Sequence, residues 1–394
     1  MPVIASQIRL VTSDVRRHEF WFGAIRATQR SRLEYWIAKP AMPTSDAPTR
    51  DHFDSLAYSL ARYNGNARKF AFPLRDPSVE NHASWRQKAR AELIDMLGPM
   101  PAERVPASPR LGREVARPGY TRVTATFETR RDLTAFGYFL IPEKAAANKK
   151  TPAILCLPGH GFGVDDLVGI GPNGREHEHA QGYQYRFAVQ CVEHGYAVLA
   201  LEMLGFGRRR DSAARHAGAS HSSCQPAAGA ALLLGESMAG WRVWDALRAL
   251  DLLADRPEVD PSRLGVMGIS GGGTVAFYAA ALDERIKATV MSGSFCTFRD
   301  SILSIGHCMD NYVPGILRSF EVADISGLIA PRGLFCECGV DDTIFPARGV
   351  RTALRDAERI FEAEGARGQL GHAFFNGPHE FNGRAAFPWL AEHL

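Results

Sequence analysis

Residues 264–274 read LGVMGISGGGT, and this stretch decides the predicted fold. An apolar run ends at Gly268, Ser270 follows two residues later, and glycines then lead into the apolar run 275–281. This order predicts a buried strand, a tight turn with Ser270 at its apex, and a helix. Such a turn strains the serine backbone, and side chains at Gly268 or Gly272 would collide across it. The stretch therefore predicts an elbow between a strand and a helix.

The spacing Gly268-x-Ser270-x-Gly272 is typical of the nucleophile elbow of a serine hydrolase, although the short pattern also arises by chance. The alternative is an ordinary strand-to-helix loop with a surface serine. A serine hydroxyl becomes a good nucleophile only when a base takes its proton and a third group orients that base. A nucleophilic Ser270 therefore requires an acid and a base elsewhere in the chain.

An acid and a base follow the next predicted strands. Residues 338–346 read CGVDDTIFP and residues 375–381 read FNGPHEF. In an elbow of this kind the chain order is serine, then aspartate or glutamate, then histidine. His379, among turn residues, is the predicted general base, and its alternative is a hydrogen-bonded histidine of a surface loop. Asp341 and Asp342 are neighbours on an extended segment and point in opposite directions, so only one readily faces the histidine.

A tetrahedral intermediate also needs two backbone N–H donors, which form an oxyanion hole. The amide of Gly271, directly after the nucleophile, is one predicted donor. The second is the amide of Phe162 in LPGHGFG, residues 157–163, where glycines let the backbone approach a substrate. The alternative is a plain glycine-rich turn.

The remainder of the chain predicts an α/β protein with a mainly parallel, twisted sheet flanked by helices. Two runs, 120–129 and 135–142, resemble an antiparallel pair. Strands and helices then alternate from about residue 150. Strands are expected at 153–157, 196–201, 264–268, 286–292, 333–338 and 369–375, and helices at 183–194, 238–255, 347–363 and 385–394. Residues 203–237 and 294–330 are long enough to be lids over the strand ends.

The N-terminal third has a different pattern. Helices are expected at 15–38 and 51–63, and around 85–97, where Trp85, Ala89, Leu93 and Leu97 share one helical face. A proline-rich link, 99–118, follows. The expected organisation is an N-terminal helical extension, 1–118, that packs on a catalytic domain, 119–394.

Composition narrows the function classes. The 394 residues are 45% hydrophobic and 23% charged with a net charge of +3, which is ordinary for a globular enzyme and favours neither a nucleic-acid nor a membrane partner. The seven scattered cysteines do not form a disulfide framework. No signal peptide and no membrane-spanning run is evident, so the cytoplasm is the expected location. The expected partner is a small ester substrate, and a homo-oligomer is left open.

Taken together, these motifs resemble the dienelactone hydrolase/acetyl xylan esterase-like branch of the α/β-hydrolases. The likeness extends over residues 120–394, and includes Gly-x-x-Asp-x-x-x-Pro, which favours Asp342 as the acid, and Cys308 with NYVPG at 311–315. It implies a metal-independent serine carboxylesterase, often a carbohydrate deacetylase, without a cofactor. Dienelactone hydrolases use cysteine where Ser270 stands, so a dienelactone substrate is disfavoured. His307 and Tyr312, on the second lid segment, are expected to shape the substrate pocket.

Two rival functions were weighed. Serine peptidases or amidases of the prolyl-oligopeptidase type share this core, but they usually carry a propeller, which about 110 helical residues cannot supply. A non-catalytic binding protein is disfavoured because nucleophile, acid, base and oxyanion turn are all present. The sequence His177-Glu178-His179 could hold a metal, but a His-x-His pair without further ligands is weak evidence, and no metal site is expected.

Overall fold

A computed structural model of the chain describes residues 54–74, 79–145, 150–177 and 182–394. It divides the chain into two units, residues 1–54 and 55–394, and the fold below is that of the second. The helix expected at 15–38 lies outside the described residues. Among the residues that are described, no helix is both long and apolar enough to cross a membrane.

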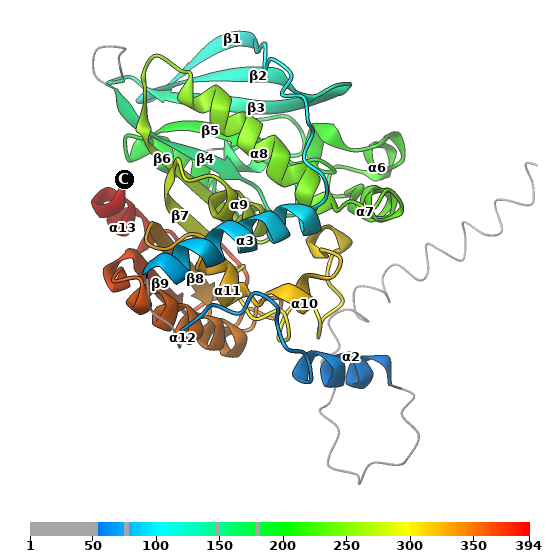
Figure 1. Ribbon diagram of the computed structural model, residues 1–394. Coiled ribbons are helices and arrows are strands. Elements are labelled where there is room, and N and C mark those ends of the chain that lie inside the picture. Colours follow the sequence, from blue (N-terminus) through cyan, green and yellow to red (C-terminus); the bar gives the residue numbers. More distant parts are fainter. Residues whose placement is uncertain (1–53, 75–78, 146–149, 178–181) are drawn as a thin grey trace, which may run out of the picture. The chain divides into compact units, whose positions relative to one another are not determined.

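The second unit alternates strands and helices along most of its length (Figure 1). The strands are β1 (Arg110–Arg117), β2 (Tyr120–Arg130), β3 (Leu133–Pro142), β4 (Thr151–Leu157), β5 (Ala197–Leu201), β6 (Val259–Ile269), β7 (Ile286–Ser292), β8 (Gly333–Gly339) and β9 (Leu370–Phe375). The α-helices are α2 (Ser55–Asn64), α3 (Val79–Leu97), α4 (Val164–Leu167), α5 (Phe187–Glu193), α6 (Ser212–Ala217), α7 (Cys224–Leu233), α8 (Met238–Ala254), α9 (Gly271–Leu282), α10 (Ile316–Ser319), α11 (Val322–Ser326), α12 (Ala347–Ala363) and α13 (Ala386–His393). Short 3₁₀ turns are η1 (Gly207–Arg209), η2 (Met309–Asn311) and η3 (Arg367–Gln369).

The nine strands of the described residues form one sheet in the order β1-β2-β3-β5-β4-β6-β7-β8-β9. The first three strands and β5 pair antiparallel, whereas β5, β4, β6, β7, β8 and β9 run parallel to one another. The carboxyl ends of the parallel strands therefore meet at one edge of the sheet, where open α/β sheets place their ligand sites.

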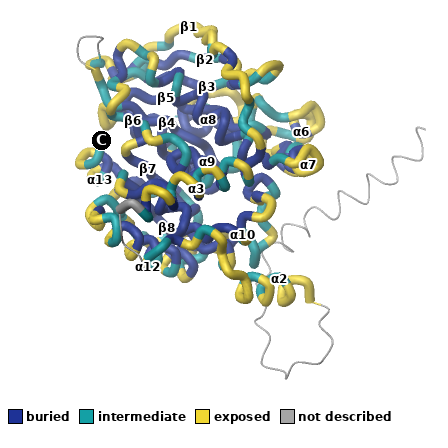
Figure 2. The backbone as a smooth tube through the Cα atoms, in the orientation of Figure 1, coloured by how far each residue is buried: buried dark blue, intermediate teal, exposed yellow. Residues whose placement is uncertain are grey.

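Helices cover both faces of the sheet, and a separate apolar cluster fills each interface. On one face, α3, α8, α9, α11 and α12 contribute to the larger cluster; Figure 1 shows α3, α8 and α9 in front of the strands. On the other face, α4, α5 and α13 pack over the second cluster. The parallel strands β5, β7 and β8 are almost entirely buried, as their dark blue colour in Figure 2 shows, and this explains their nearly continuous apolar sequences.

The predicted fold class, a mainly parallel sheet flanked by helices, is confirmed. Two elements differ from the sequence analysis. The strand β1 lies inside the segment assigned to the N-terminal extension, where prolines and glycines on either side concealed it. The helix α5 begins at Phe187 rather than Tyr183, because Tyr185 and Arg186 have positive φ angles of 50° and 53° and form a turn instead.

Candidate active site

The predicted elbow is present between β6 and α9. Ser270 has φ 55° and ψ −125°, a strained conformation for a residue with a side chain, and it is only 6% exposed. An ideal Cβ on Gly272 would stand 2.1 Å from the carbonyl oxygen of Leu157, and one on Gly268 would stand 2.3 Å from the carbonyl oxygen of Gly272. Because backbone occupies that space, the turn requires glycine at both positions.

Asp342 and His379 meet at the ends of β8 and β9. Asp342 Oδ2 lies 2.7 Å from His379 Nδ1. The other carboxylate oxygen, Oδ1, accepts hydrogen bonds from the backbone N–H groups of Ile344 at 2.8 Å and Phe345 at 2.9 Å. These bonds fix the carboxylate in one orientation. Asp341 is exposed, and its backbone N–H donates to the carbonyl of Gly377 at 3.0 Å, so the two neighbours have separate surroundings.

The His379 imidazole is held between two aromatic rings. Its centroid lies 5.4 Å from that of Tyr183 and 5.8 Å from that of Phe345, and both rings are nearly parallel to it. Within the described part of the chain, the buried His379 Nε2 has no hydrogen-bond partner. The ring is thus positioned through Nδ1 and its two faces, while Nε2 stays available.

Ser270 is tied to this pair through the end of β7. The Ser270 N–H donates to the carbonyl of Ser292 at 2.9 Å. The next residue, Gly293, has φ +50°, and an ideal Cβ on it would lie 3.0 Å from His379 Nδ1 and 3.3 Å from Asp342 Oδ2. No bond between the Ser270 and His379 side chains is present among the described residues. The structure therefore gathers the three predicted residues at one edge of the sheet, with the serine and histidine not directly bonded.

The loop after β4 lies against the start of α9. Gly271 is the first residue of that helix, so its N–H is one of those that a helix cannot bond internally. An ideal Cβ on Gly271 would lie 3.7 Å from His160 Cε1, which places the His160 ring beside the elbow. Phe162 is two residues further along the same loop and is partly buried. Both predicted backbone donors thus belong to segments next to Ser270.

Two residues close to Ser270 were not singled out from the sequence. Tyr183 is buried, which raises the pKa of its hydroxyl, and a hydrogen bond with the Ser270 side chain opposes that shift. His160 was quoted only as part of the glycine-rich motif. Each lies 87 or more residues before Ser270 in the sequence, and the fold of the sheet brings both residues to the elbow. In the sequence, Tyr183 was marked only as an aromatic residue at the start of a predicted helix.

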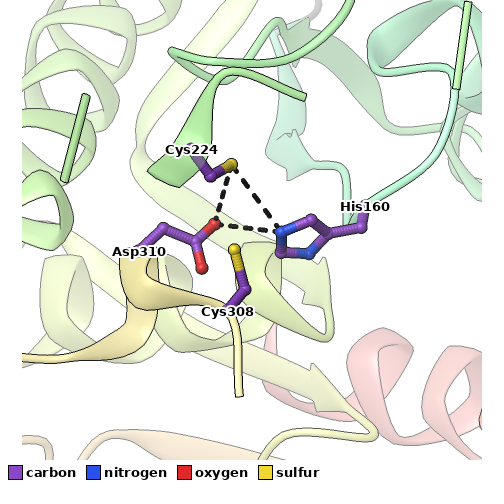
Figure 3. A group of neighbouring side chains, drawn as sticks. All are labelled: His160, Cys224, Cys308 and Asp310. Atoms are coloured by element: carbon purple, nitrogen blue, oxygen red, sulfur yellow. Dashed lines mark hydrogen bonds and ion pairs between the residues drawn. The ribbon is translucent and has the colours of Figure 1, made fainter. Parts of the chain in front are cut away.

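His160 belongs to a group of polar side chains, shown in Figure 3. Its Nε2 lies 3.2 Å from Asp310 Oδ2 and 3.7 Å from Cys224 Sγ. The buried Arg242 contacts both Asp310 and Cys224. Burial by itself would lower the pKa of His160, but the adjacent Asp310 carboxylate, with Cys224, raises it to about 9.

The two residues predicted to shape the pocket are neighbours, because the backbone N–H of His307 donates a hydrogen bond to the Tyr312 hydroxyl. The His307 ring packs edge-on against Phe345 at 5.2 Å, which places it next to the ring stacked on His379. Burial lowers the pKa of His307 to about 4. Tyr312 is 38% exposed, and its hydroxyl donates to the carbonyl of Ile302 at 3.1 Å. Of the two, His307 is the one adjacent to the candidate site.

The His-x-His sequence considered as a metal pair is only partly visible. His177 is described, whereas Glu178 and His179 lie outside the described residues. All seven cysteines are described, and all are free thiols.

Comparisons with known proteins agree with this architecture. The model of the Abhydrolase family matches residues 65–359. A Bacillus subtilis (strain 168) protein named "Putative hydrolase YtaP" is 31% identical over 291 residues, which cover 71% of this chain and 89% of that protein. Two solved structures share the fold. A "putative acetyl xylan esterase" from Bacteroides fragilis has a TM-score of 0.72 at 19% identity and covers 87% of this chain and 95% of its own. A glucuronoyl esterase from Solibacter usitatus has a TM-score of 0.57 at 18% identity, with coverages of 78% and 93%.

Proposed function

Because the chain belongs to the Abhydrolase family of hydrolases, we propose that it is a serine carboxylesterase that acts on small acyl esters, including those of carbohydrates. The observation that carries the proposal is the arrangement of His379, whose Nδ1 is held by Asp342 while its buried Nε2 has no partner among the described residues. This is the arrangement that a general base needs beside a nucleophilic serine.

The proposed reaction proceeds through an acyl-enzyme. Ser270 Oγ attacks the ester carbonyl carbon as His379 Nε2 accepts the hydroxyl proton, and the Asp342 carboxylate stabilises the imidazolium that forms. The N–H groups of Gly271 and Phe162 stabilise the negative oxygen of the tetrahedral intermediate. The alcohol leaves with the proton from His379. Water then attacks the acyl group, again with His379 as base, and the released acid restores Ser270.

A small pocket beside the site is suited to a short acyl group. Its lining includes Thr274, one helical turn after Ser270, together with Ser294 and Phe345, and most of the remaining lining is apolar. An apolar wall excludes water and favours a compact acyl chain over a charged one. The names of the structural neighbours, acetyl xylan esterase and glucuronoyl esterase, support a carbohydrate ester as substrate class.

The peptidase alternative gains no support from the fold. Among residues 54–74 and 79–109, the described part of the chain before the sheet, there are helices but no strands, so a propeller is not present there. We therefore retain the esterase as the single proposed function, with a small ester as its partner and without nucleic acid or membrane.

The proposal is tested by substrate preference and by removal of the nucleophile. Hydrolysis rates of p-nitrophenyl acetate, an acetylated xylo-oligosaccharide, a methyl glucuronate ester and an aminoacyl anilide should rank the esters above the anilide. Ser270→Ala should lower kcat about 10⁴-fold or more with an unchanged circular dichroism spectrum. An organophosphonate should add its mass to the Ser270 peptide. Labelling of a different serine, or an undiminished rate in the variant, would overturn the assignment.

A further inference from the structure

A second group of reactive side chains lies next to the elbow, and the proposed reaction does not use it. It consists of His160, Cys224, Cys308 and Asp310, and we call it the His-Cys₂-Asp cluster. One potential donor atom from each residue lies within 4.8 Å of the other three. Figure 3 shows the four side chains pointing toward one another, with Cys308 and Asp310 on the same short segment. We propose that this cluster binds one zinc ion.

The spacing of the donor atoms matches tetrahedral zinc coordination. Zinc–nitrogen and zinc–oxygen bonds of about 2.0 Å and zinc–sulfur bonds of about 2.3 Å require donors roughly 3.3 Å apart for a nitrogen–oxygen pair, roughly 3.5 Å apart for sulfur with nitrogen or oxygen, and roughly 3.8 Å apart for two sulfurs. In the cluster, His160 Nε2 and Asp310 Oδ2 are 3.2 Å apart. Cys224 Sγ lies 3.4 Å from that carboxylate oxygen and 3.7 Å from Nε2. Three edges of the tetrahedron are thus formed, and Cys308 supplies the fourth vertex.

The charges around the cluster favour a divalent cation. Two thiolates and a carboxylate carry three negative charges, and zinc with the buried guanidinium of Arg242 carries three positive ones. Arg242 Nη1 contacts Asp310 Oδ2, and Nη2 lies 3.2 Å from Cys224 Sγ, so the arginine stabilises the charged forms of both donors. A buried group of charges is tolerated when it is neutral as a whole and fully paired.

A second layer of contacts orients the donors, as is usual for metal ligands. Asn311 Nδ2 donates to the other oxygen of Asp310 at 2.9 Å, which leaves Oδ2 for the metal and for Arg242. The His160 ring packs edge-on against Phe206 at 4.7 Å, and the Arg242 guanidinium lies over the same phenyl ring, 4.4 Å from its centroid. These contacts hold the histidine and the arginine in place before any ion arrives.

A zinc ion here would join three connections of the fold. His160 follows β4, Cys224 begins α7, and Cys308 and Asp310 lie at η2. With four protein donors no coordination position is left for substrate or water, which is the pattern of structural rather than catalytic zinc. The site would therefore fix the two long connections, 203–237 and 294–330, against the loop beside the elbow. This inference does not depend on the proposed esterase activity.

The test uses the full-length protein, reduced, stripped with a chelator and titrated with zinc chloride alone. We expect about one equivalent of bound zinc by elemental analysis, and an unfolding midpoint a few degrees higher than that of the stripped protein. Titration with cobalt(II) should give the intense near-ultraviolet thiolate-to-cobalt charge-transfer absorption and the visible bands of a tetrahedral site. These readouts do not require activity, so they stay informative if the esterase proposal fails.

Matched cysteine variants locate the ion. Cys224→Ser and Cys308→Ser should each lose the zinc equivalent and the charge-transfer absorption. Cys191→Ser is the control and should retain both signals. Cys191 Sγ lies 3.8 Å from Cys156 Sγ, and within the described part of the chain this pair does not belong to a group of potential metal ligands. If a variant does not fold, the cobalt spectrum of the parent protein still shows whether thiolates bind a tetrahedral metal ion. Absence of zinc binding with all seven thiols reduced, or retention of binding in both variants, would overturn the proposal.

Discussion

Two adjacent aspartates differ in their surroundings, and the proposed mechanism assigns a role to only one of them. Asp342 is buried against His379, with its second oxygen held by two backbone N–H groups, whereas Asp341 is exposed. Asp342→Asn should lower kcat about 10²–10⁴-fold, because the amide does not stabilise an imidazolium and favours the wrong tautomer. Asp341→Asn should stay within a few-fold of the parent.

Steady-state kinetics of both variants on p-nitrophenyl acetate decide between the two positions. If the two variants exchange these behaviours, the acid is Asp341 and the contact with His379 is not the functional one. If both keep full activity, the acid lies elsewhere in the chain.

Individual site residues could be predicted from the sequence where they belong to a short local motif, but not where they come together from distant parts of the chain. The order Ser270, Asp342, His379 was predicted because each residue follows its own strand within a short recognisable segment. The His-Cys₂-Asp cluster was not predicted, because its members are separated by as many as 150 positions and meet only through the sheet order. The choice of Asp342 over Asp341 came from family resemblance, since alternation alone says that one of the two faces the histidine without saying which.

At the scale of elements, the elbow lies so close to the end of β4 that a side chain at Gly272 should destabilise the folded protein. Gly272→Ala would place its Cβ 2.1 Å from the Leu157 carbonyl, and two backbone segments would have to separate. We expect a loss of at least about 1–3 kcal/mol in the free energy of unfolding, the usual range for overpacking.

The matched control is Gly229→Ala, within α7, where no atom lies within 4 Å of the ideal Cβ. Alanine favours a helix more than glycine does, so this variant should be unchanged or more stable by about 0.5–1 kcal/mol. Urea denaturation of both proteins measures the difference. A Gly272→Ala protein as stable as the parent would contradict the packing described for the elbow.

Elements with strong periodicity were predicted well, and elements defined by turns were not. The helix α12 and the strand β7 have the bounds that the apolar pattern indicated. The strand β1 was missed because it is largely exposed and lacks an apolar face. The start of α5 was placed four residues early, since the positive φ angles of Tyr185 and Arg186 leave no mark in the residue types.

For the whole molecule, a buried histidine should make stability depend on pH. Burial, with the nearby His160 and His379, lowers the pKa of His307 to about 4, against about 6.5 in an unfolded chain. The Asp310 and Asp342 carboxylates oppose that shift. Between these two values the unfolded chain binds a proton that the folded protein does not, so the free energy of unfolding falls as the pH drops from about 6.5 to 4.

Thermal unfolding across this pH window tests the prediction. His307→Gln should show a shallower decline of the unfolding midpoint than the parent, because the substituted side chain has no proton to gain. His372→Gln, whose side chain is 41% exposed in the parent, serves as the control and should decline as the parent does. If the unfolding midpoint falls equally steeply with decreasing pH in all three proteins, a group other than His307 causes the loss of stability in acid.

The position of β9 has a consequence for how the molecule loses activity. This strand is the last in the sheet, pairs only with β8, and is nowhere fully buried, yet His379 follows it directly. Ser270 follows β6, three strands further in. Edge strands open at lower free energy than central ones, so transient fraying of β9 would carry His379, the proposed base, away while Ser270, the proposed nucleophile, stays in an intact core. We expect amide hydrogens of β9 to exchange faster than those of β6, and heat inactivation to begin before the bulk of the sheet melts.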